Sequence, residues 1–225
     1  MAVDLQEIHG GREVIYAFFA RLFLEPLSES EYKMMQEILP LLKDLEDISE
    51  TAGKEISRLE DFIAEYNSLK NKELDAFKLD NLRAFTRIFA LTDSVPNSES
   101  YYTSLEHLVN QESREQVLKL YRNFGFDTDF HNSNEPEDFI AYELMFLSYL
   151  SRKTVRCMQD GKEDNYNIIV NVQKEFIKDH LLSYIDEFIN KMEMFEQGKI
   201  LYLPLTYFLR EYLKYDYEFL NSLNN

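Results

Sequence analysis

Apolar residues recur along most of the chain at the spacing of one buried helix face. Over residues 4–24 they fall three and four positions apart, at Val14, Ile15, Phe18, Phe19, Leu22 and Phe23. This period is typical of an amphipathic helix that packs one side against a core. The same pattern predicts further helices over residues 28–47, 50–70, 73–91, 164–192 and 199–221. Pro26 should end the first of these helices. Ser28 and Glu31 form a capping box at the start of the second, which Pro40 should kink or break.

Residues 134–150 differ from the other segments because their apolar positions surround the whole helix. Between residues 139 and 150 only Glu143 and Ser148 are clearly polar, which is typical of a buried helix. About 12 apolar residues are too few to cross a bilayer, which takes ~20. We expect Asn134 to cap this helix, with Pro136 in its first turn and Glu137 completing a capping box.

The connections between the predicted helices are short, with two exceptions. Residues 92–102 are rich in Ser, Asn, Asp and Pro, which predicts a long loop. Ser113 and Gln116 can cap a following helix that ends near Gly125. Residues 125–135 then form an acidic, hinge-like link before the central helix, which should end at Gly161.

Composition favours helices over sheets. Six Gly and five Pro among 225 residues leave little material for the turns of a many-stranded sheet. We therefore predict an all-α fold, with residues 1–225 forming a single bundle-like domain of roughly 8–11 helices.

The formal charge of −17 restricts the possible partners. Nucleic acid and anionic membrane surfaces attract cationic proteins, so both are disfavoured, whereas a basic partner is compatible. We expect no stable membrane insertion, because no segment reaches the length of a membrane span. A single Cys157 and an acidic N-terminus without an apolar signal region fit a cytoplasmic protein.

Searches for catalytic and metal-binding motifs are negative. The sequence contains no phosphate-binding glycine loop and no dinucleotide fingerprint. No Glu precedes a His by three positions, as carboxylate di-iron bundles require, and no His-Glu-x-x-His occurs. Ser98, Ser100 and Ser104 precede His107 without a nucleophile-elbow pattern. We therefore expect no enzyme activity, no metal and no cofactor.

Glu143 is a carboxylate within an otherwise apolar helix. A buried charge without a partner costs several kcal/mol, so such groups are normally paired. We predict a structural ion pair between Glu143 and an arginine such as Arg83 or Arg87.

Five segments resemble one protein family in the order in which they occur. Residues 135–147 are similar to the E-P-x-D-H-(I/L)-x-x-E-L-x-F-(M/L) signature of the TorD/DmsD redox-enzyme maturation chaperones, which are related to NarJ. Residues 85–89 and 95–102 resemble the Y-x-R-L-F and P-x-x-S-x-Y segments of the same family. Residues 16–26 look like its first helix, and residues 176–181 match its late F-x-x-x-H-L element. One departure is Phe139, which stands where the family often has His, so no role of that His is carried over.

The resemblance implies a cytoplasmic, non-catalytic, all-α chaperone that is a monomer or a homodimer. Its partner would be the apo catalytic subunit of an exported molybdopterin oxidoreductase, bound through a basic twin-arginine signal peptide and held for cofactor insertion. Such a receptor needs carboxylates beside an apolar groove. The residues expected to form this binding site are Ser98, Glu99, Tyr102, Tyr121, Glu135, Pro136, Asp138, Phe139, Tyr142 and His180.

Three alternative functions remain open at this point. A NarJ-type assembly factor would contact the body of the enzyme rather than a signal peptide. A nucleotide-binding or hydrolytic enzyme is disfavoured by the absent phosphate loop. A helical scaffold without a dedicated client is the third.

Overall fold

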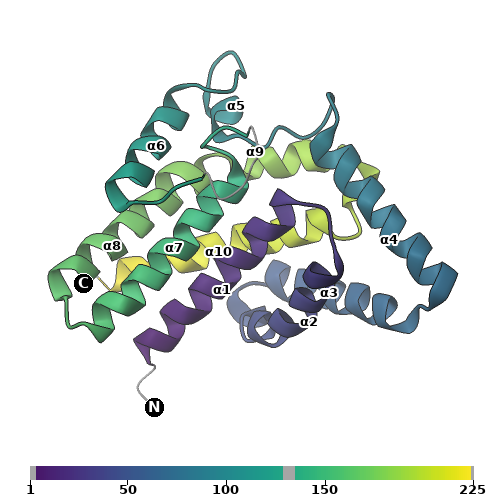
Figure 1. The fold of residues 1–225 in the computed structure, drawn as a ribbon, viewed down its shortest axis with the longest axis horizontal. Coiled ribbons are helices and arrows are strands. Elements are labelled where there is room, and N and C mark those ends of the chain that lie inside the picture. The colour runs from purple at the N-terminus through teal and green to yellow at the C-terminus, as the bar shows by residue number, and fades with distance from the viewer. Residues whose placement is uncertain (1–3, 129–134, 224–225) are drawn as a thin grey trace. The chain divides into compact units, whose positions relative to one another are not determined.

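The computed structural model describes residues 4–128 and 135–223, which are helical through most of their length (Figure 1). Within these residues there is no β-strand, only an isolated antiparallel bridge between Ser98 and Phe139. The predicted all-α class is therefore confirmed. The α-helices are α1 (Leu5–Leu24), α2 (Glu29–Lys43), α3 (Glu50–Ser68), α4 (Asn71–Phe85), α5 (Glu99–Thr103), α6 (Glu112–Phe124), α7 (Ile140–Gln159), α8 (Glu163–Phe176), α9 (Leu182–Met192) and α10 (Tyr202–Ser222).

Four shorter helical turns connect these helices. η1 (Glu46–Ile48) and η4 (Glu196–Gly198) are 3₁₀ turns. η2 (Thr86–Ala90) and η3 (Ile177–Leu181) are π-helical and continue α4 and α8 without a break. The π turns coincide with two segments that resemble the chaperone family, residues 85–89 and 176–181. Single π turns inside helices are rare and occur frequently at functional sites.

The chain divides into two compact units. Unit 1 consists of Met1–Ala20, Asn97–Tyr184 and Leu213–Asn225, and unit 2 consists of Arg21–Pro96 and Ile185–Tyr212. The prediction of a single domain stays a prediction, since α1, α9 and α10 each contribute residues to both units.

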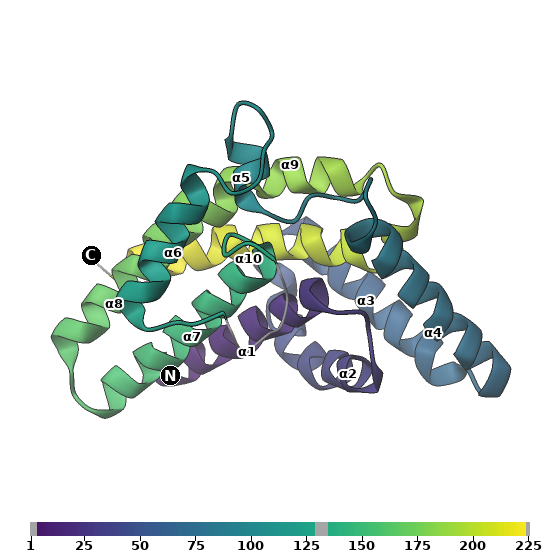
Figure 2. The same cartoon turned by 45° about the horizontal axis from the view of Figure 1, so that its top comes forward.

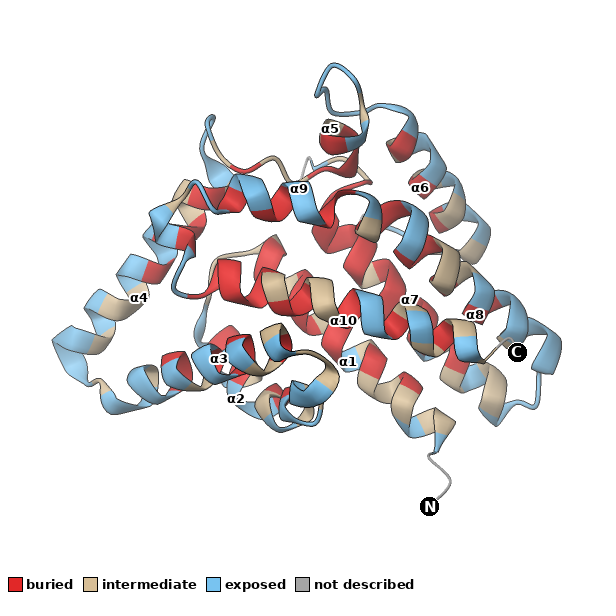
Figure 3. Cartoon of the chain, turned by 180° about the vertical axis from the view of Figure 1, so that it is seen from behind, coloured by how far each residue is buried: buried red, intermediate tan, exposed pale blue. Residues whose placement is uncertain are grey.

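Unit 1 contains the central helix α7 and most of the predicted site. Buried residues line α7 over much of its length (Figure 3), including Leu144, Phe146, Leu147 and Leu150. α8 packs alongside α7, and α5 packs against α6 (Figure 2). An ion pair joins α1 to α10, because Arg12 of α1 binds both carboxylate oxygens of Asp216 of α10, at 2.6 and 3.0 Å.

Unit 2 is held by clusters of aromatic side chains. Phe23 lies edge-on against Phe89 and Phe188. Tyr32 of α2 stacks on Tyr66 of α3 with ring centroids 4.3 Å apart. Aromatic pairs contribute about 0.5–1.5 kcal/mol beyond the burial of their area. These contacts join α1 to η2 and α9, and α2 to α3.

Several predicted helix ends need correction. The capping box of Ser28 and Glu31 is present, but Pro40 lies inside α2, which continues for three more residues. The residue that precedes α6 is Gln111 without a side-chain cap, while Ser113 contacts Thr103 instead. The predicted loop 92–102 contains the short helix α5.

The start of the central helix was also predicted too early. α7 begins at Ile140, so Pro136 and Glu137 precede it rather than forming its first turn. Asn134, the predicted cap, lies outside the described residues. The reason is tertiary, because the backbone around residue 139 bonds to another segment: Ile140 N–H donates to the Asn97 carbonyl at 2.9 Å.

No helix in the described part of the chain combines the length and apolarity that a membrane span requires.

Candidate functional site

The loop before α5 and the segment before α7 run together and form the framework of the site. Besides the bridge between Ser98 and Phe139, Glu99 N–H donates to the backbone carbonyl of Asp138 at 2.9 Å. Ser100 N–H donates to the Asp138 carboxylate at 2.8 Å. The Asp138 carboxylate therefore accepts a backbone hydrogen bond from the first turn of α5, as a capping carboxylate does, rather than one from α7. Residues 97–100 are thereby joined to residues 138–140, which lie about forty positions later in the sequence.

A cluster of buried ionisable groups lies on this framework. His180 Nδ1, in the π turn η3, is 2.8 Å from Oε2 of Glu99, and both side chains are almost fully buried. Glu143 of α7 is completely buried and accepts a hydrogen bond of 2.8 Å from Tyr184 Oη. One potential ligand atom from each of Glu99, Glu143 and His180 lies within 4.8 Å of the other two.

Burial governs the protonation of this cluster. Burial and the neighbouring Glu99 raise the pKa of Glu143 well above its usual value. The pKa of Asp138 is also raised, mainly by burial, although the Ser100 hydrogen bond opposes the shift. Burial followed by the charge of Glu143 raises the pKa of both Tyr121 and Tyr184. Charged carboxylates are therefore disfavoured here unless a cation or a proton compensates them.

The expected ion pair between Glu143 and Arg87 needs correction. Glu143 is buried as expected, but its hydrogen-bond donor is the Tyr184 hydroxyl. Arg87 is partly exposed, donates to the Asp93 carbonyl and lies over the ring of Phe195. Arg83, the other candidate, pairs with Asp80 one turn away. A phenol can satisfy a carboxyl oxygen without bringing a charge, which the sequence pattern did not reveal.

The structure gathers most of the residues predicted for the binding site, but it buries them. Ser98, Tyr102, Tyr121, Phe139 and Tyr142 are each at most 7% exposed. Tyr102 stacks on Tyr184, and Phe176 lies against the ring of His180. These side chains therefore form a packed wall behind the ionisable cluster rather than an open groove.

Two of the residues predicted for the site, Glu135 and Pro136, lie nearer to the surface, as does their neighbour Glu137. Glu135 is exposed and Pro136 is partly exposed. Glu137 forms a bidentate pair with Arg114 of α6 at 2.5 and 3.1 Å. Burial alone would raise the pKa of Glu137, but the Arg114 hydrogen bonds lower it. The acidic segment before α7 is thus partly neutralised by α6.

An open cleft of about 480 Å³ lies beside the buried cluster and was not predicted. Its acidic lining consists of Glu99, Glu112 and Asp179. The rest of the lining is Thr103, Ser104, Leu105, Gln111, Ser113, Gln116 and Ser183. Glu99 therefore connects the cleft with His180 and Glu143.

The loop beside the cleft exposes apolar side chains. Leu105 is fully exposed, and Leu108 and Val109 are about half exposed, at 49% and 47%. His107 and Asn110 in this loop have positive φ angles of 52° and 60°. The two exposed leucines were a signal in the sequence, but only the fold places them beside three carboxylates.

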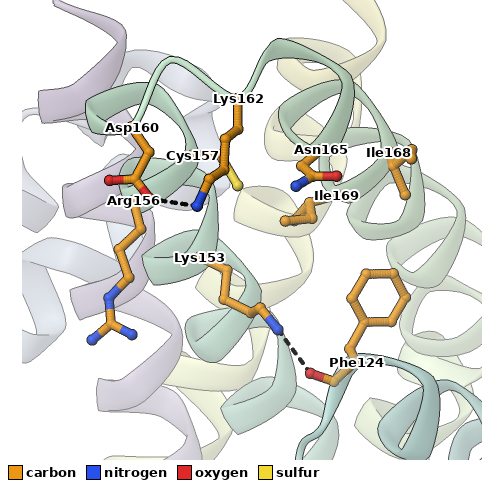
Figure 4. Close-up of a pocket in the computed structure, with 9 residues that line it drawn as sticks. All are labelled: Phe124, Lys153, Arg156, Cys157, Asp160, Lys162, Asn165, Ile168 and Ile169. Carbon is orange, nitrogen blue, oxygen red and sulfur yellow. Dashed lines mark hydrogen bonds and ion pairs between the residues drawn. The ribbon is translucent and has the colours of Figure 1, made fainter.

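A second pocket, of about 380 Å³, has the opposite charge character (Figure 4). Its lining includes Lys153, Arg156 and Lys162 together with Cys157. Lys153 donates to the Phe124 carbonyl at 2.8 Å, and Lys162 pairs with Asp160 at 2.7 Å. Two of the three cations of this pocket therefore already have partners.

Comparisons with known proteins give one consistent result. The family model described as "Nitrate reductase delta subunit" matches residues 45–190, more than half of the chain. "Chaperone protein TorD" of Vibrio parahaemolyticus is 29% identical over 222 residues, covering 96% of this chain and 98% of that protein. "Chaperone protein TorD" of Vibrio cholerae is 26% identical over 200 residues, covering 87% and 86% of the two chains. The chain therefore belongs to the nitrate reductase delta subunit family, the TorD and NarJ group.

Proposed function

We propose that this protein is a maturation chaperone for an exported molybdopterin oxidoreductase. It binds the apo catalytic subunit through a twin-arginine signal peptide in the cytoplasm and holds that subunit until the cofactor is inserted. Membership of the family and the similarity to proteins named TorD support the chaperone role. The observation that carries the peptide-binding step is the acidic cleft of Glu99, Glu112 and Asp179 beside the exposed apolar loop.

The chemistry of such a signal fits this surface. Two adjacent guanidinium groups can each form bidentate, charge-assisted hydrogen bonds with carboxylates. Glu112 and Asp179 are exposed, so their carboxylates can be reached from solvent. The apolar segment that follows the arginines can cover Leu105, Leu108 and Val109, which removes apolar surface from water. Glu135 stays part of the proposed surface as an exposed acid on the segment before α7.

The first prediction concerns the cleft carboxylates. The double substitution Glu112→Gln and Asp179→Asn should weaken binding of a synthetic twin-arginine signal peptide by ~1–3 kcal/mol, because it removes charge-assisted hydrogen bonds. Isothermal titration calorimetry at low salt measures this difference. Asp138 is not suited to the test, since it also holds the start of α5.

A matched control separates local contacts from net charge. Glu46→Gln with Asp47→Asn removes the same charge from a different pocket, in unit 2. The control should bind the peptide as the unmodified protein does. Equal weakening by both double variants would show that only overall charge matters, and absence of micromolar binding by the unmodified protein would refute the peptide proposal.

The second candidate function is assembly through the body of the client enzyme, as in NarJ-type factors. The family model that matches this chain carries the description "Nitrate reductase delta subunit", which supports this second function. Deleting the signal peptide from the client distinguishes the two, because only contact with the enzyme body survives the deletion. Co-purification of the truncated client with this chain would favour the second function.

A further inference from the structure

Unsatisfied polar atoms gather in the ionisable cluster of unit 1. Within residues 4–128 and 135–223, buried oxygens without a hydrogen-bond partner include Oε1 of Glu143, Oδ1 of Asp138, Oη of Tyr121 and Oγ of Ser100. Glu143 and Ser100 are fully buried, and Tyr121 is 1% exposed. A buried polar group without a hydrogen-bond partner costs about 1–3 kcal/mol, so two carboxyl oxygens and two hydroxyls in one region indicate a missing partner.

The buried carboxyl groups of this cluster favour a positively charged partner. Three carboxyl groups, those of Glu99, Asp138 and Glu143, lie in one buried region. His180, which pairs with Glu99, can carry a positive charge there. Two ionised carboxylates cannot donate hydrogen bonds to each other, so Glu99 cannot satisfy Oε1 of Glu143 unless an oxygen carries a proton. A bound proton or a metal ion can supply the charge.

The arrangement of donor atoms favours a metal ion. We propose that Glu99, Glu143 and His180 bind a divalent transition-metal ion of the Zn²⁺ class. Metal–ligand bonds of about 2.0–2.2 Å place tetrahedral ligand atoms ~3.4 Å apart. The three donor atoms already lie within 4.8 Å of one another, and His180 Nδ1 is 2.8 Å from Glu99. Movements of well under one bond length therefore bring them into coordination.

The surroundings of the three ligands suit a metal site. Tyr184 Oη holds the second oxygen of Glu143, which leaves Oε1 available for the ion. Such outer hydrogen bonds orient ligands and tune affinity. Two carboxylates and one imidazole match the ligand types of Zn²⁺, Mn²⁺ and Fe²⁺. Glu99 also lines the acidic cleft, which gives the ion a route from solvent.

A bound ion would join three separate elements of unit 1. Glu99 lies in α5, Glu143 in α7 and His180 in the π turn η3. The ion would thereby fix the floor of the acidic cleft through Glu99. The inference does not depend on the proposed client, because it concerns the chain alone.

Spectroscopy on the isolated protein tests the proposal. After removal of metals with a chelator, Co²⁺ should bind with a stoichiometry of one and give visible d–d absorption, and Zn²⁺ should displace it. Zn²⁺ should also raise Tm, because it binds the folded state preferentially. Glu143→Gln and His180→Gln should each abolish the spectrum, whereas His107→Gln, which changes an exposed histidine, should leave it intact.

Tyr184→Phe provides a test that does not remove a ligand. It should weaken Zn²⁺ binding ~10–100-fold, because the hydroxyl only positions Glu143. Absence of the Co²⁺ spectrum and of saturable Zn²⁺ binding in the unmodified protein overturns the proposal and leaves a shared proton as the compensating charge. That result would not affect the peptide titration, which is carried out without metal.

Discussion

His9 is a neutral imidazole enclosed in the core of unit 1. Its Nδ1 lies 2.9 Å from Nη1 of Arg12, and its ring is fully buried. Because arginine can only donate, Nδ1 must be the acceptor, and the ring proton lies on Nε2, 3.4 Å from Tyr166 Oη. Burial first and the charge of Arg12 second lower the pKa of His9 to about 3.

Acidification should therefore destabilise the fold through His9. In the unfolded chain His9 binds a proton as the pH falls through about 6.5, whereas the folded state does not until about pH 3. The unfolded state then binds more protons, so the free energy of unfolding decreases between these values. From pH 7.5 to pH 5 this one group should remove ~2 kcal/mol. Urea denaturation at both pH values measures the loss.

The variant His9→Gln isolates this contribution. It removes the titrating group, so its unfolding free energy should fall less between pH 7.5 and pH 5 than that of the unmodified protein. The same decrease in both proteins would mean that His9 is not the group responsible.

At the scale of elements, two glycines show how position decides the effect of a substitution. Gly125 ends α6 with φ of 69°, in the left-handed region. Among the residues that the structure describes, a Cβ at Gly125 would meet only the Tyr149 hydroxyl, at 3.8 Å, so the cost of a side chain is backbone strain. Gly10 lies inside α1, and a Cβ there would meet no described atom within 4 Å.

The same change should have opposite effects at these positions. Gly125→Ala should destabilise the protein by ~1–2 kcal/mol, the cost of the left-handed conformation for an L-residue. Gly10→Ala should stabilise it by ~0.5–1 kcal/mol, because alanine loses less conformational freedom in a helix. Thermal or urea unfolding of both variants tests the pair. Stabilisation by Gly125→Ala would contradict the left-handed end of α6.

At the scale of the whole molecule, the net charge of −17 should strengthen the association with basic peptides. A strongly acidic protein attracts a cationic peptide, and the range of this attraction decreases as the salt concentration rises. The acids that line the cleft add a local contribution to this attraction. The helical fold itself does not depend on the sign of this charge.

Salt should therefore weaken peptide binding. Raising NaCl from about 50 to 500 mM should reduce the affinity for a twin-arginine peptide ~10-fold. A peptide with glutamine in place of both arginines should show a smaller change. Calorimetry at the two salt concentrations compares them, and salt-independent binding of the arginine peptide would assign the interaction to the apolar loop alone.

The sequence determined the helical character of this protein, because helix periodicity is a local property. The apolar spacing in residues 4–24 and the capping box at Ser28 depend only on near neighbours, and both agree with the structure. The buried position of Glu143 also followed from its apolar neighbours. The order of the family-like motifs indicated the family, and the comparisons confirmed it.

Only the tertiary structure decided where the functional groups lie. Asp138 holds the start of α5 rather than of its own helix, and Tyr184 rather than an arginine satisfies Glu143. A search of the sequence for metal motifs relies on ligands three or four residues apart. Glu99, Glu143 and His180 are instead separated by about forty residues each, and packing alone brings them within 4.8 Å. Side-chain partners across such separations are fixed by three-dimensional packing, which local patterns do not encode.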